Sequence, residues 1–295
     1  MKRSVHEPVY ASGRTRLRKV TGSADQYTYD QNGNMTSDEI NRNKNIKYDH
    51  RNLITELRHK ELVHEDSIVY VNYYNYDEAG NRIAKTVYRY TDSSEPSDTL
   101  SEEDVSISSS WELYKAEIYS RDVSGRELAV YKDNAIEEYP IYGLDMIGKL
   151  KNDIPYYYYK DHLGSVRAVV NANNELVSAQ DYDQWGFILQ GRTYESDDSK
   201  FKFTGKERDE ENKYDYFGAR YYDARIGRWG SEDPLGWKYP LQSPYNYVFN
   251  NPLLFKDRDG RDVIVEVDGT NIKVTIKFYY TTKGTKGLSD DKIGL

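Results

Sequence analysis

Short apolar strands alternate along the chain with a recurring turn unit that begins with Tyr-Asp. The clearest copies start at Tyr29, Tyr48 and Tyr76, and each has a Gly or Asn three or four residues after the Tyr. Asp can accept hydrogen bonds from a turn backbone, and Asn or Gly tolerates the positive φ of a tight hairpin. Each unit therefore predicts one hairpin corner, and because a lone hairpin is only marginally stable, the units are expected to stack into a longer sheet. Looser copies start at Tyr119, Tyr159, Tyr182 and Tyr222. An ordinary β-sandwich rich in hairpins is the alternative that this pattern leaves open.

Residues 91–110 interrupt the repeat with a stretch in which Ser and acidic residues dominate. So few apolar residues predict a solvated loop or a mobile insertion. A functional acidic patch is the alternative interpretation of the same composition.

The composition and pattern of the chain change twice more towards its end. From Phe203 to Asp262 it is dense in Gly, Pro, Asn, Asp and aromatic residues, which predicts a folded plug or junction made largely of turns. Apolar residues then alternate from Val263 to Val267 and from Ile272 to Phe278, on either side of the turn signal Asp268-Gly269, and predict a hairpin. The sequence stops at a helix-start signal, so the tail from 263 to 295 is interpreted as truncated.

The composition supports a β fold and excludes several kinds of site. Among 295 residues there are 30 Tyr, a residue that suits partly exposed sheet surfaces. The absence of Cys excludes disulfides, zinc-thiolate sites and Cys nucleophiles. The net charge of -8 argues against nucleic acid as the main partner. No apolar run is long enough for a membrane span, and the basic start lacks the apolar segment of a signal peptide.

Several motifs in a fixed order resemble the bacterial Rhs/YD-repeat proteins. The Tyr-Asp units are followed by YYYYKDHLGSVRAVV, then FTGKERDEENKYDYFGARYYDARIGRW, then SPYNYVFNNPLLFKDRDGRD, which resemble the RHS repeat-associated core domain. The resemblance implies a mainly β fold, in which stacked antiparallel YD-repeat hairpins form part of a spiral β-shell closed by a turn-rich core domain. It implies four regions: an N-terminal lead-in at 1–26, the YD-repeat region at 27–154, the core domain at 155–262 and a variable tail at 263–295.

Common catalytic signatures are incomplete in this sequence. His59 and His64 are five residues apart, which separates them on a helix or a strand, so no metal site is expected. Gly205-Lys206 lacks the remainder of a phosphate loop, and Ser165 lacks the second Gly of a nucleophile elbow. Asp161-His162 is expected to make a turn rather than part of a catalytic triad. No cofactor is therefore expected.

The resemblance implies one catalytic possibility. An aspartic-type peptidase needs two carboxylates that share a proton, one acting as base toward a water while the other polarises the carbonyl. In Rhs-type proteins the core domain cuts its own chain near its end. The resemblance places Asp233 and Asp257 as the two acids and Arg220 as their charge partner. It places the cut between Arg261 and Asp262.

Two departures from the family pattern affect that cut. Arg258 stands where the family has Pro, and Arg261 stands where it has Leu. The loss of Pro loosens the strand presented for cleavage, and a pocket made for Leu would reject a guanidinium because burying an unpaired charge is costly. Cleavage is therefore expected to be impaired or absent, and a plain junction of turns and ion pairs is the alternative. Packing or ion-pair roles are expected for Arg208, Arg228, Trp185, Trp229 and Trp237.

The resemblance implies the shell and plug portion of a polymorphic toxin used in intercellular competition. Such a protein encapsulates or presents a variable C-terminal effector, and its partners are that effector segment, an immunity protein or a secretion-system component. A secreted or cell-envelope location follows from the same resemblance. Only 33 residues follow Asp262, too few for most toxin domains. The alternatives are a self-cleaving peptidase acting after Arg261, and a cell-surface carbohydrate-binding or adhesion protein whose sheet exposes Tyr.

Overall fold

A computed structural model describes most of the chain. It places residues 9–10, 16–20, 25–63, 66–92, 96–97, 100–195, 199–261, 263–267 and 270–271. The expected second strand of the tail hairpin, from Ile272 to Phe278, lies outside these residues. So does Asp262, on the far side of the expected cut.

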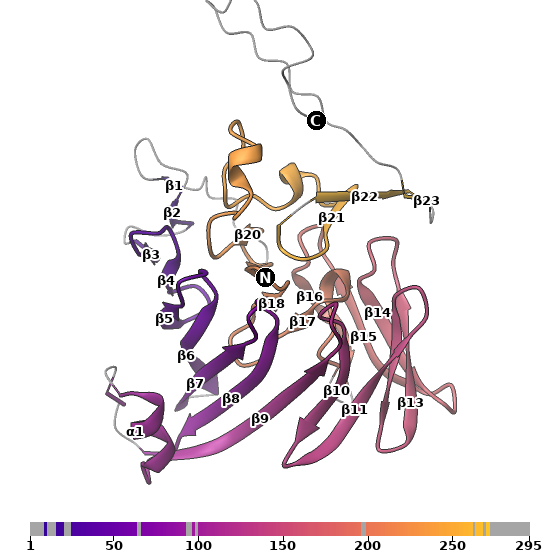
Figure 1. Ribbon diagram of the computed structural model, residues 1–295, viewed down its shortest axis with the longest axis horizontal. Helices are drawn as coiled ribbons and strands as arrows, with labels where there is room; N and C mark the ends of the chain where they lie inside the picture. The colour runs from indigo at the N-terminus through magenta and orange to yellow at the C-terminus, as the bar shows by residue number, and fades with distance from the viewer. Residues whose placement is uncertain are drawn as a thin grey trace, which may run out of the picture.

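One antiparallel sheet of 14 strands dominates the described chain (Figure 1). Its strands lie side by side in the order of the sequence, from β3 at one edge to β16 at the other. The first seven are β3 (Tyr27–Tyr29), β4 (Met35–Asp38), β5 (Asn43–Tyr48), β6 (Ile54–Val63), β7 (Asp66–Tyr76), β8 (Arg82–Tyr90) and β9 (Trp111–Arg121). The other seven are β10 (Glu127–Lys132), β11 (Ala135–Tyr142), β12 (Met146–Lys151), β13 (Ile154–Lys160), β14 (Val166–Asn171), β15 (Leu176–Tyr182) and β16 (Ile188–Glu195). The predicted mainly β fold of stacked antiparallel hairpins is confirmed.

The Tyr-Asp units form the hairpin corners of this sheet, as predicted. In the clearest copies the Asp Oδ1 accepts from the backbone N–H four residues on: Asp30 from Asn34 at 2.8 Å, Asp49 from Leu53 at 3.0 Å and Asp77 from Asn81 at 2.8 Å. The residue before that donor has positive φ, 87° at Gly33, 64° at Asn52 and 88° at Gly80. The turn therefore needs an Asp and a Gly or Asn at fixed spacing, which is why it can be read from the sequence.

The expectation of a plain loop at 91–110 is wrong, because this segment contains the helix α1 (Glu102–Ile107). Ser101 and Asp104 form a capping box that satisfies backbone N–H groups at the start of the helix. Val105 is fully buried and packs with Val71 and Tyr73 of β7. Of the two apolar residues of the helix, Val105 is the one that packs on the sheet, whereas Ile107 is exposed.

Helix α1 and residues 199–261 occupy opposite faces of the sheet. Successive side chains of a strand point to opposite faces. On β7, Tyr73 packs in the cluster with Val105 of α1, whereas Tyr74 donates to Asp209 Oδ2 at 3.1 Å. We call the face that carries Tyr74 the inner face and the face that carries α1 the outer face.

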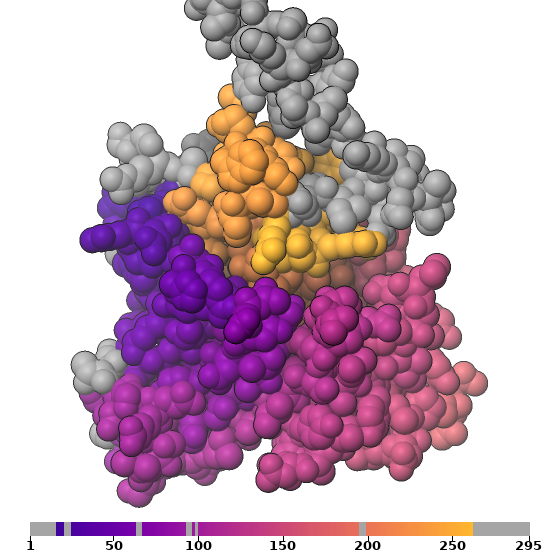
Figure 2. Space-filling model, in the orientation of Figure 1, coloured from indigo at the N-terminus to yellow at the C-terminus, as the bar shows by residue number. Residues whose placement is uncertain are grey.

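Residues 199–261, which we call the turn-rich segment, pack on the inner face near one end of the strands (Figure 2). The segment holds a small four-stranded sheet and three single turns of 3₁₀ helix. Its elements are η1 (Phe203–Gly205), β17 (Glu207–Arg208), β18 (Asp215–Tyr216), β19 (Tyr221–Asp223), β20 (Arg228–Trp229), η2 (Gly236–Lys238), η3 (Val248–Asn250) and β21 (Phe255–Asp257). Its own aromatic core centres on Tyr222, which lies 4.5 Å from Tyr247 and 5.3 Å from Trp229 between ring centroids. The predicted turn-rich character is confirmed, and the segment packs around a cluster of aromatic rings.

The remaining strands are short. At the N-terminal end, β1 (Val9–Tyr10) pairs with β2 (Leu17–Lys19). Beyond the turn-rich segment, β22 (Val263–Val267) pairs with β21 and also with β23 (Thr270–Asn271). The first strand of the expected tail hairpin is therefore present, and it extends the edge of the turn-rich segment.

The large sheet runs through the expected boundary at residue 155. Strand β13 begins at Ile154 and is hydrogen-bonded to β12 on one side and β14 on the other. The change of architecture comes between Glu195, where the last strand of the sheet ends, and Ser199. The division at 155 stays a prediction about sequence families, because hairpins of one sheet lie on both sides of it.

Candidate functional site

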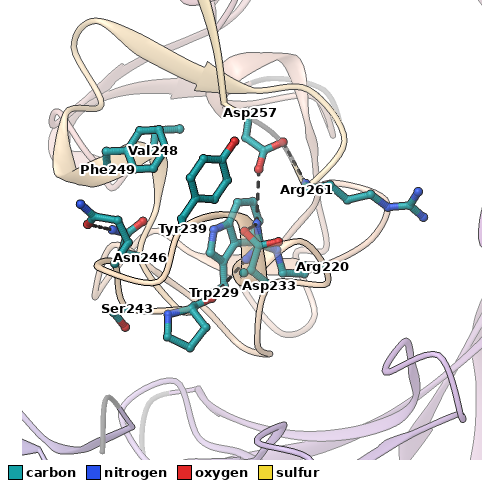
Figure 3. A pocket seen from close by; sticks show the side chains of 13 residues that line it. Arg220, Trp229, Asp233, Tyr239, Ser243, Asn246, Val248, Phe249, Asp257 and Arg261 are labelled. Atoms are coloured by element: carbon teal, nitrogen blue, oxygen red, sulfur yellow. Dashed lines mark hydrogen bonds and ion pairs between the residues drawn. The ribbon is translucent and has the colours of Figure 1, made fainter. Parts of the chain in front are cut away.

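Arg220, Asp233 and Asp257 come together in a pocket of the turn-rich segment (Figure 3). They come from three places: the residue before β19, the turn after β20 and the end of β21. Arg220 Nη2 lies 3.0 Å from Asp233 Oδ2 and 3.5 Å from Asp257 Oδ2. The three residues that the resemblance singles out are thus neighbours, with the guanidinium in contact with both carboxylates.

Each carboxylate divides its two oxygens between a turn and Arg220. Asp233 Oδ1 accepts from the Leu235 N–H at 2.7 Å. Asp257 Oδ1 accepts from the N–H groups of Asp259, Gly260 and Arg261 at 3.1, 2.7 and 3.2 Å. In each Asp, Oδ1 accepts the turn hydrogen bonds and Oδ2 contacts Arg220. A role in a turn and a role in the site are therefore compatible for these two side chains.

Arg220 is buried, and several groups fix its position. Its centre lies 4.2 Å from the Trp229 ring centroid, its Nη1 donates to the Pro244 carbonyl at 3.3 Å, and its Nε donates to the Gly260 carbonyl. Burial lowers the pKa of Arg220, while Asp233 and Asp257 oppose that shift. Trp229, for which the sequence predicts a packing or ion-pair role, supplies one wall of the guanidinium site with its ring face.

The pKa of Asp257 differs from that of an exposed carboxyl. Burial raises the pKa of Asp257 to about 6, although Arg220 and the turn N–H groups act to lower it. The carboxyl therefore exchanges its proton in the mildly acidic range. That behaviour is what an acid group in an aspartic-type reaction requires.

The conflict expected at Arg261 does not arise in this structure. The Arg261 side chain is exposed and points away from Asp257 and Arg220 (Figure 3). Arg258 is exposed as well, and its carbonyl accepts from Lys206 Nζ. Because the Arg261 guanidinium reaches solvent, it does not incur the cost of burial expected in a pocket made for Leu.

The other residues considered from the sequence divide between turns, packing and the surface. Asp161 Oδ1 accepts from the Ser165 N–H at 2.9 Å, which makes the expected turn, and Arg208 pairs with Asp215 at 2.7 Å. Trp185 packs against the aromatic core, whereas Trp237 is exposed, so its expected packing role is wrong. Arg228 lies over the Tyr245 ring at 5.6 Å.

Two kinds of feature are absent from the described residues. No helix in the placed part of the chain is long and apolar enough to cross a membrane. Within the same residues, no group of three or more His, Cys, Asp or Glu side chains is arranged to hold a metal ion.

The sequence interpretation missed a buried ion network between the sheet and the turn-rich segment. Arg82 pairs with Glu207 and Asp209, each at 2.8 Å. Lys85 lies 3.2 Å from Glu117, 3.1 Å from Asp209 and 3.5 Å from Glu211. Further along the inner face, Lys200 reaches Glu138 at 2.6 Å. The run KERDEEN at 206–212 is the only sequence signal of it, and nothing in that run shows what its acids face.

The charges of this network compensate one another. Burial alone would raise the pKa of Glu207, but Arg82, Lys200 and Lys85 lower it to about 2. The same proximity raises the pKa of Lys85, against the effect of its burial. The network thus keeps opposite charges paired inside the protein, and three of its acids, Glu207, Asp209 and Glu211, come from a segment distant in sequence from Arg82 and Lys85.

Comparison with known proteins adds a family match and several relatives. The Teneurin YD-shell family model matches residues 140–259, a range that includes Arg220, Asp233 and Asp257. The chain is 35% identical over 115 residues to Toxin subunit YenC1 of Yersinia entomophaga, covering 38% of this chain and 12% of that protein. It is 29% identical over 272 residues to the tRNA(Glu)-specific nuclease WapA of Bacillus subtilis subsp. natto, covering 89% of this chain and 10% of that protein.

Solved structures show the same fold at low sequence identity. A crystal structure of TcdB2-TccC3 superimposes with a TM-score of 0.54 at 20% identity, over 79% of this chain and 11% of that chain. The Photorhabdus luminescens Tc holotoxin pore gives a TM-score of 0.55 at 18% identity, over 83% of this chain and 11% of that chain. The chain thus spans about a tenth of the length of the proteins that it matches here.

Proposed function

Since this chain is an Rhs/YD-shell protein, we propose that it is the shell and plug portion of a secreted toxin that encapsulates or presents a variable C-terminal effector. The observation that carries the proposal is the seating of the turn-rich segment on the inner face, by the buried ion pairs of Arg82 and Lys85 with Glu207, Asp209 and Glu211. In this role the sheet is a section of the shell wall and the turn-rich segment is the plug. The effector segment follows the plug in the chain.

The proposal implies partners beyond this chain. The effector segment is the first of them, and an immunity protein or a secretion-system component would meet the protein outside the shell. The resemblance to Toxin subunit YenC1 and to TcdB2-TccC3 supports association with other toxin components. The net charge of -8 argues against nucleic acid as the main partner.

Protease protection tests the encapsulation of the effector. We expect the segment after Asp262 of a natural full-length protein of this kind to resist trypsin. Its half-life should be at least tenfold longer than in the Asp209→Ala variant, in which the plug is loosened. The reason is that Asp209 forms ion pairs with the buried cations of the sheet, so its loss weakens the contact between the plug and the sheet. Band intensities over time give the measurement.

Glu112→Ala supplies the matched control, because Glu112 makes an exposed ion pair with Arg89 on the sheet. The control should protect the segment as well as the natural protein does. Equal digestion of the segment in all three proteins would contradict the proposed role.

We further propose that the site at Arg220 performs an aspartic-type cleavage after Arg261. The contact of both carboxylates with one guanidinium, and the hydrogen bond of the Arg261 N–H to Asp257, favour it. In this reaction water attacks the Arg261 carbonyl carbon and Asp233 takes the proton of the water. Protonated Asp257 polarises the carbonyl oxygen, and the C–N bond to residue 262 breaks with the proton delivered to the leaving amine.

Mass spectrometry of the intact protein tests the cleavage. We expect incubation at about pH 5 to yield a fragment ending at Arg261, and Asp233→Asn to slow its formation by about 100-fold or more because the base is lost. The rate should fall by about tenfold per pH unit above 6, since deprotonated Asp257 cannot polarise the carbonyl. Asp133→Asn, a change in the exposed turn between β10 and β11, is the control and should leave the rate unchanged. A single uncleaved mass after long incubation would refute the reaction.

A further inference from the structure

A second pair of acidic side chains meets where the first hairpins of the sheet touch the turn-rich segment. Asp38 ends β4 and Asp223 ends β19, and both are almost completely buried. The side-chain amide of Asn41 donates to Asp38 Oδ2 at 2.7 Å and to Asp223 Oδ2 at 2.8 Å. The two carboxyl groups are close enough to act on each other's pKa. A single amide group therefore spans two carboxyls that are 185 positions apart in the sequence.

The other oxygens of the pair are committed to turns. Asp38 Oδ1 accepts from the N–H groups of Ile40 and Asn41, both at 3.0 Å. Asp223 Oδ1 accepts from the Arg225 N–H at 2.8 Å. The Oδ2 atoms are thus left to face each other, and Tyr214 also donates to Asp38 Oδ2 at 2.8 Å.

Few charged groups face this pair from the elements around it. Tyr27 of β3 and Tyr214 of the turn-rich segment are neutral hydroxyl groups, and their pKa values are raised by burial and by the two acids. Arg225 is the cation whose charge acts on Asp223, and its Nη1 donates to the Ile40 carbonyl at 2.7 Å. Two negative charges in contact would face one cation, in a buried place where their repulsion is strong.

We infer that Asp38 and Asp223 share one proton and form a clip, so that the seating of the β4–β5 hairpin on the turn-rich segment depends on pH. The proton supplies the hydrogen bond that joins the two carboxyls. When it leaves, two buried carboxylates repel each other and the hairpin is released from the segment. The clip is separate from the site at Arg220 and does not depend on whether the chain is cleaved.

The direction of the pH effect follows from linkage. Burial and the neighbouring acid raise the pKa of Asp223 well above its usual range, so the folded pair holds a proton that the unfolded chain gives up. The clip is therefore fully effective at low pH, and it weakens as the pH rises above the ordinary Asp range towards the raised value. The turn carboxyl of Asp77 behaves in the opposite way, because hydrogen bonds from Asn81 outweigh burial and lower its pKa.

Hydrogen exchange of the whole chain tests this inference. After correction for intrinsic exchange, we expect the opening constant of amides 35–47 to rise as the pH increases above the ordinary titration range of Asp, by up to tenfold per unit for one proton. Asp38→Asn and Asp223→Asn should each abolish that rise, because an amide keeps the turn acceptor and cannot ionise. Asp77→Asn, a change in a hairpin corner without a second acid, should keep it.

Two outcomes would overturn the inference: an opening constant independent of pH in the natural chain, or the same pH dependence in both Asn variants as in the natural chain. If the variants do not fold, carboxyl ¹³C shifts of the natural chain decide the question. The inference requires that an Asp assigned to position 38 or 223 titrate above the exposed Asp residues. Ordinary titration of both would overturn it.

Discussion

Replacing Asp209 with Ala is expected to lower the free energy of unfolding by about 3 to 5 kcal/mol, the usual cost of removing one partner of a buried ion pair. Asp209 is 0% exposed, and its carboxylate contacts Arg82 at 2.8 Å, Lys85 at 3.1 Å and the Tyr74 hydroxyl at 3.1 Å. The substitution removes a negative charge while Arg82 and Lys85 stay buried. Their lost compensation, rather than lost packing, dominates the effect.

Urea unfolding followed by Trp fluorescence measures this change, with Glu112→Ala as the comparison. Glu112 and Arg89 form an ion pair of two half-exposed side chains, which is worth less than about 1 kcal/mol. Similar losses for the two variants would show that the network contributes no more than a surface pair.

Replacing Gly186 with Ala is expected to cost about 2 to 5 kcal/mol. Gly186 has φ of 86°, and a left-handed conformation costs a residue with a Cβ about 1 to 2 kcal/mol. An added Cβ would also collide with the buried ring of Phe203. That ring stacks on Tyr222 at 6.1 Å between centroids, so moving it disturbs the aromatic core and adds about 1 to 3 kcal/mol.

Gly191→Ala separates the two causes. Gly191 has φ of 75°, and nothing lies within 4 Å of the position its Cβ would take. The variant should therefore lose only the conformational part, about 1 to 2 kcal/mol, in the same thermal or urea measurement. Equal losses at 186 and 191 would mean that the collision with Phe203 is relieved without cost.

The corners of the sheet could be predicted from the sequence because the interactions that make them are local. Asp77 and Asn81 satisfy one turn within five residues, and Gly80 supplies its positive φ. Helix α1 was missed because its stability depends on Val105 meeting Val71 and Tyr73, which composition alone does not show. A Ser-rich acidic stretch has the same composition whether or not an apolar sheet face is available for it to pack against.

The candidate site was named by resemblance to a family and not by pattern. Asp233 and Asp257 each look like ordinary turn residues, and each also makes a turn. What the sequence could not show is the shared contact with Arg220 and the wall supplied by Trp229. The ion network was missed for the same reason, because Arg82 and Asp209 are 127 residues apart.

The order of strands in the large sheet also sets an order of assembly. Each strand pairs with its neighbours in the sequence, so pairing can proceed from β3 to β16 as the chain emerges during synthesis. Arg82 joins the growing sheet long before Glu207 and Asp209 exist to neutralise it, whereas Lys85 has Glu117 of β9 as a partner within the sheet. Until then the Arg82 guanidinium must stay hydrated, which keeps the inner face open to water. Residues 207–211 supply the missing acids for Arg82, so their arrival converts an open and wet inner face into a closed and dry one.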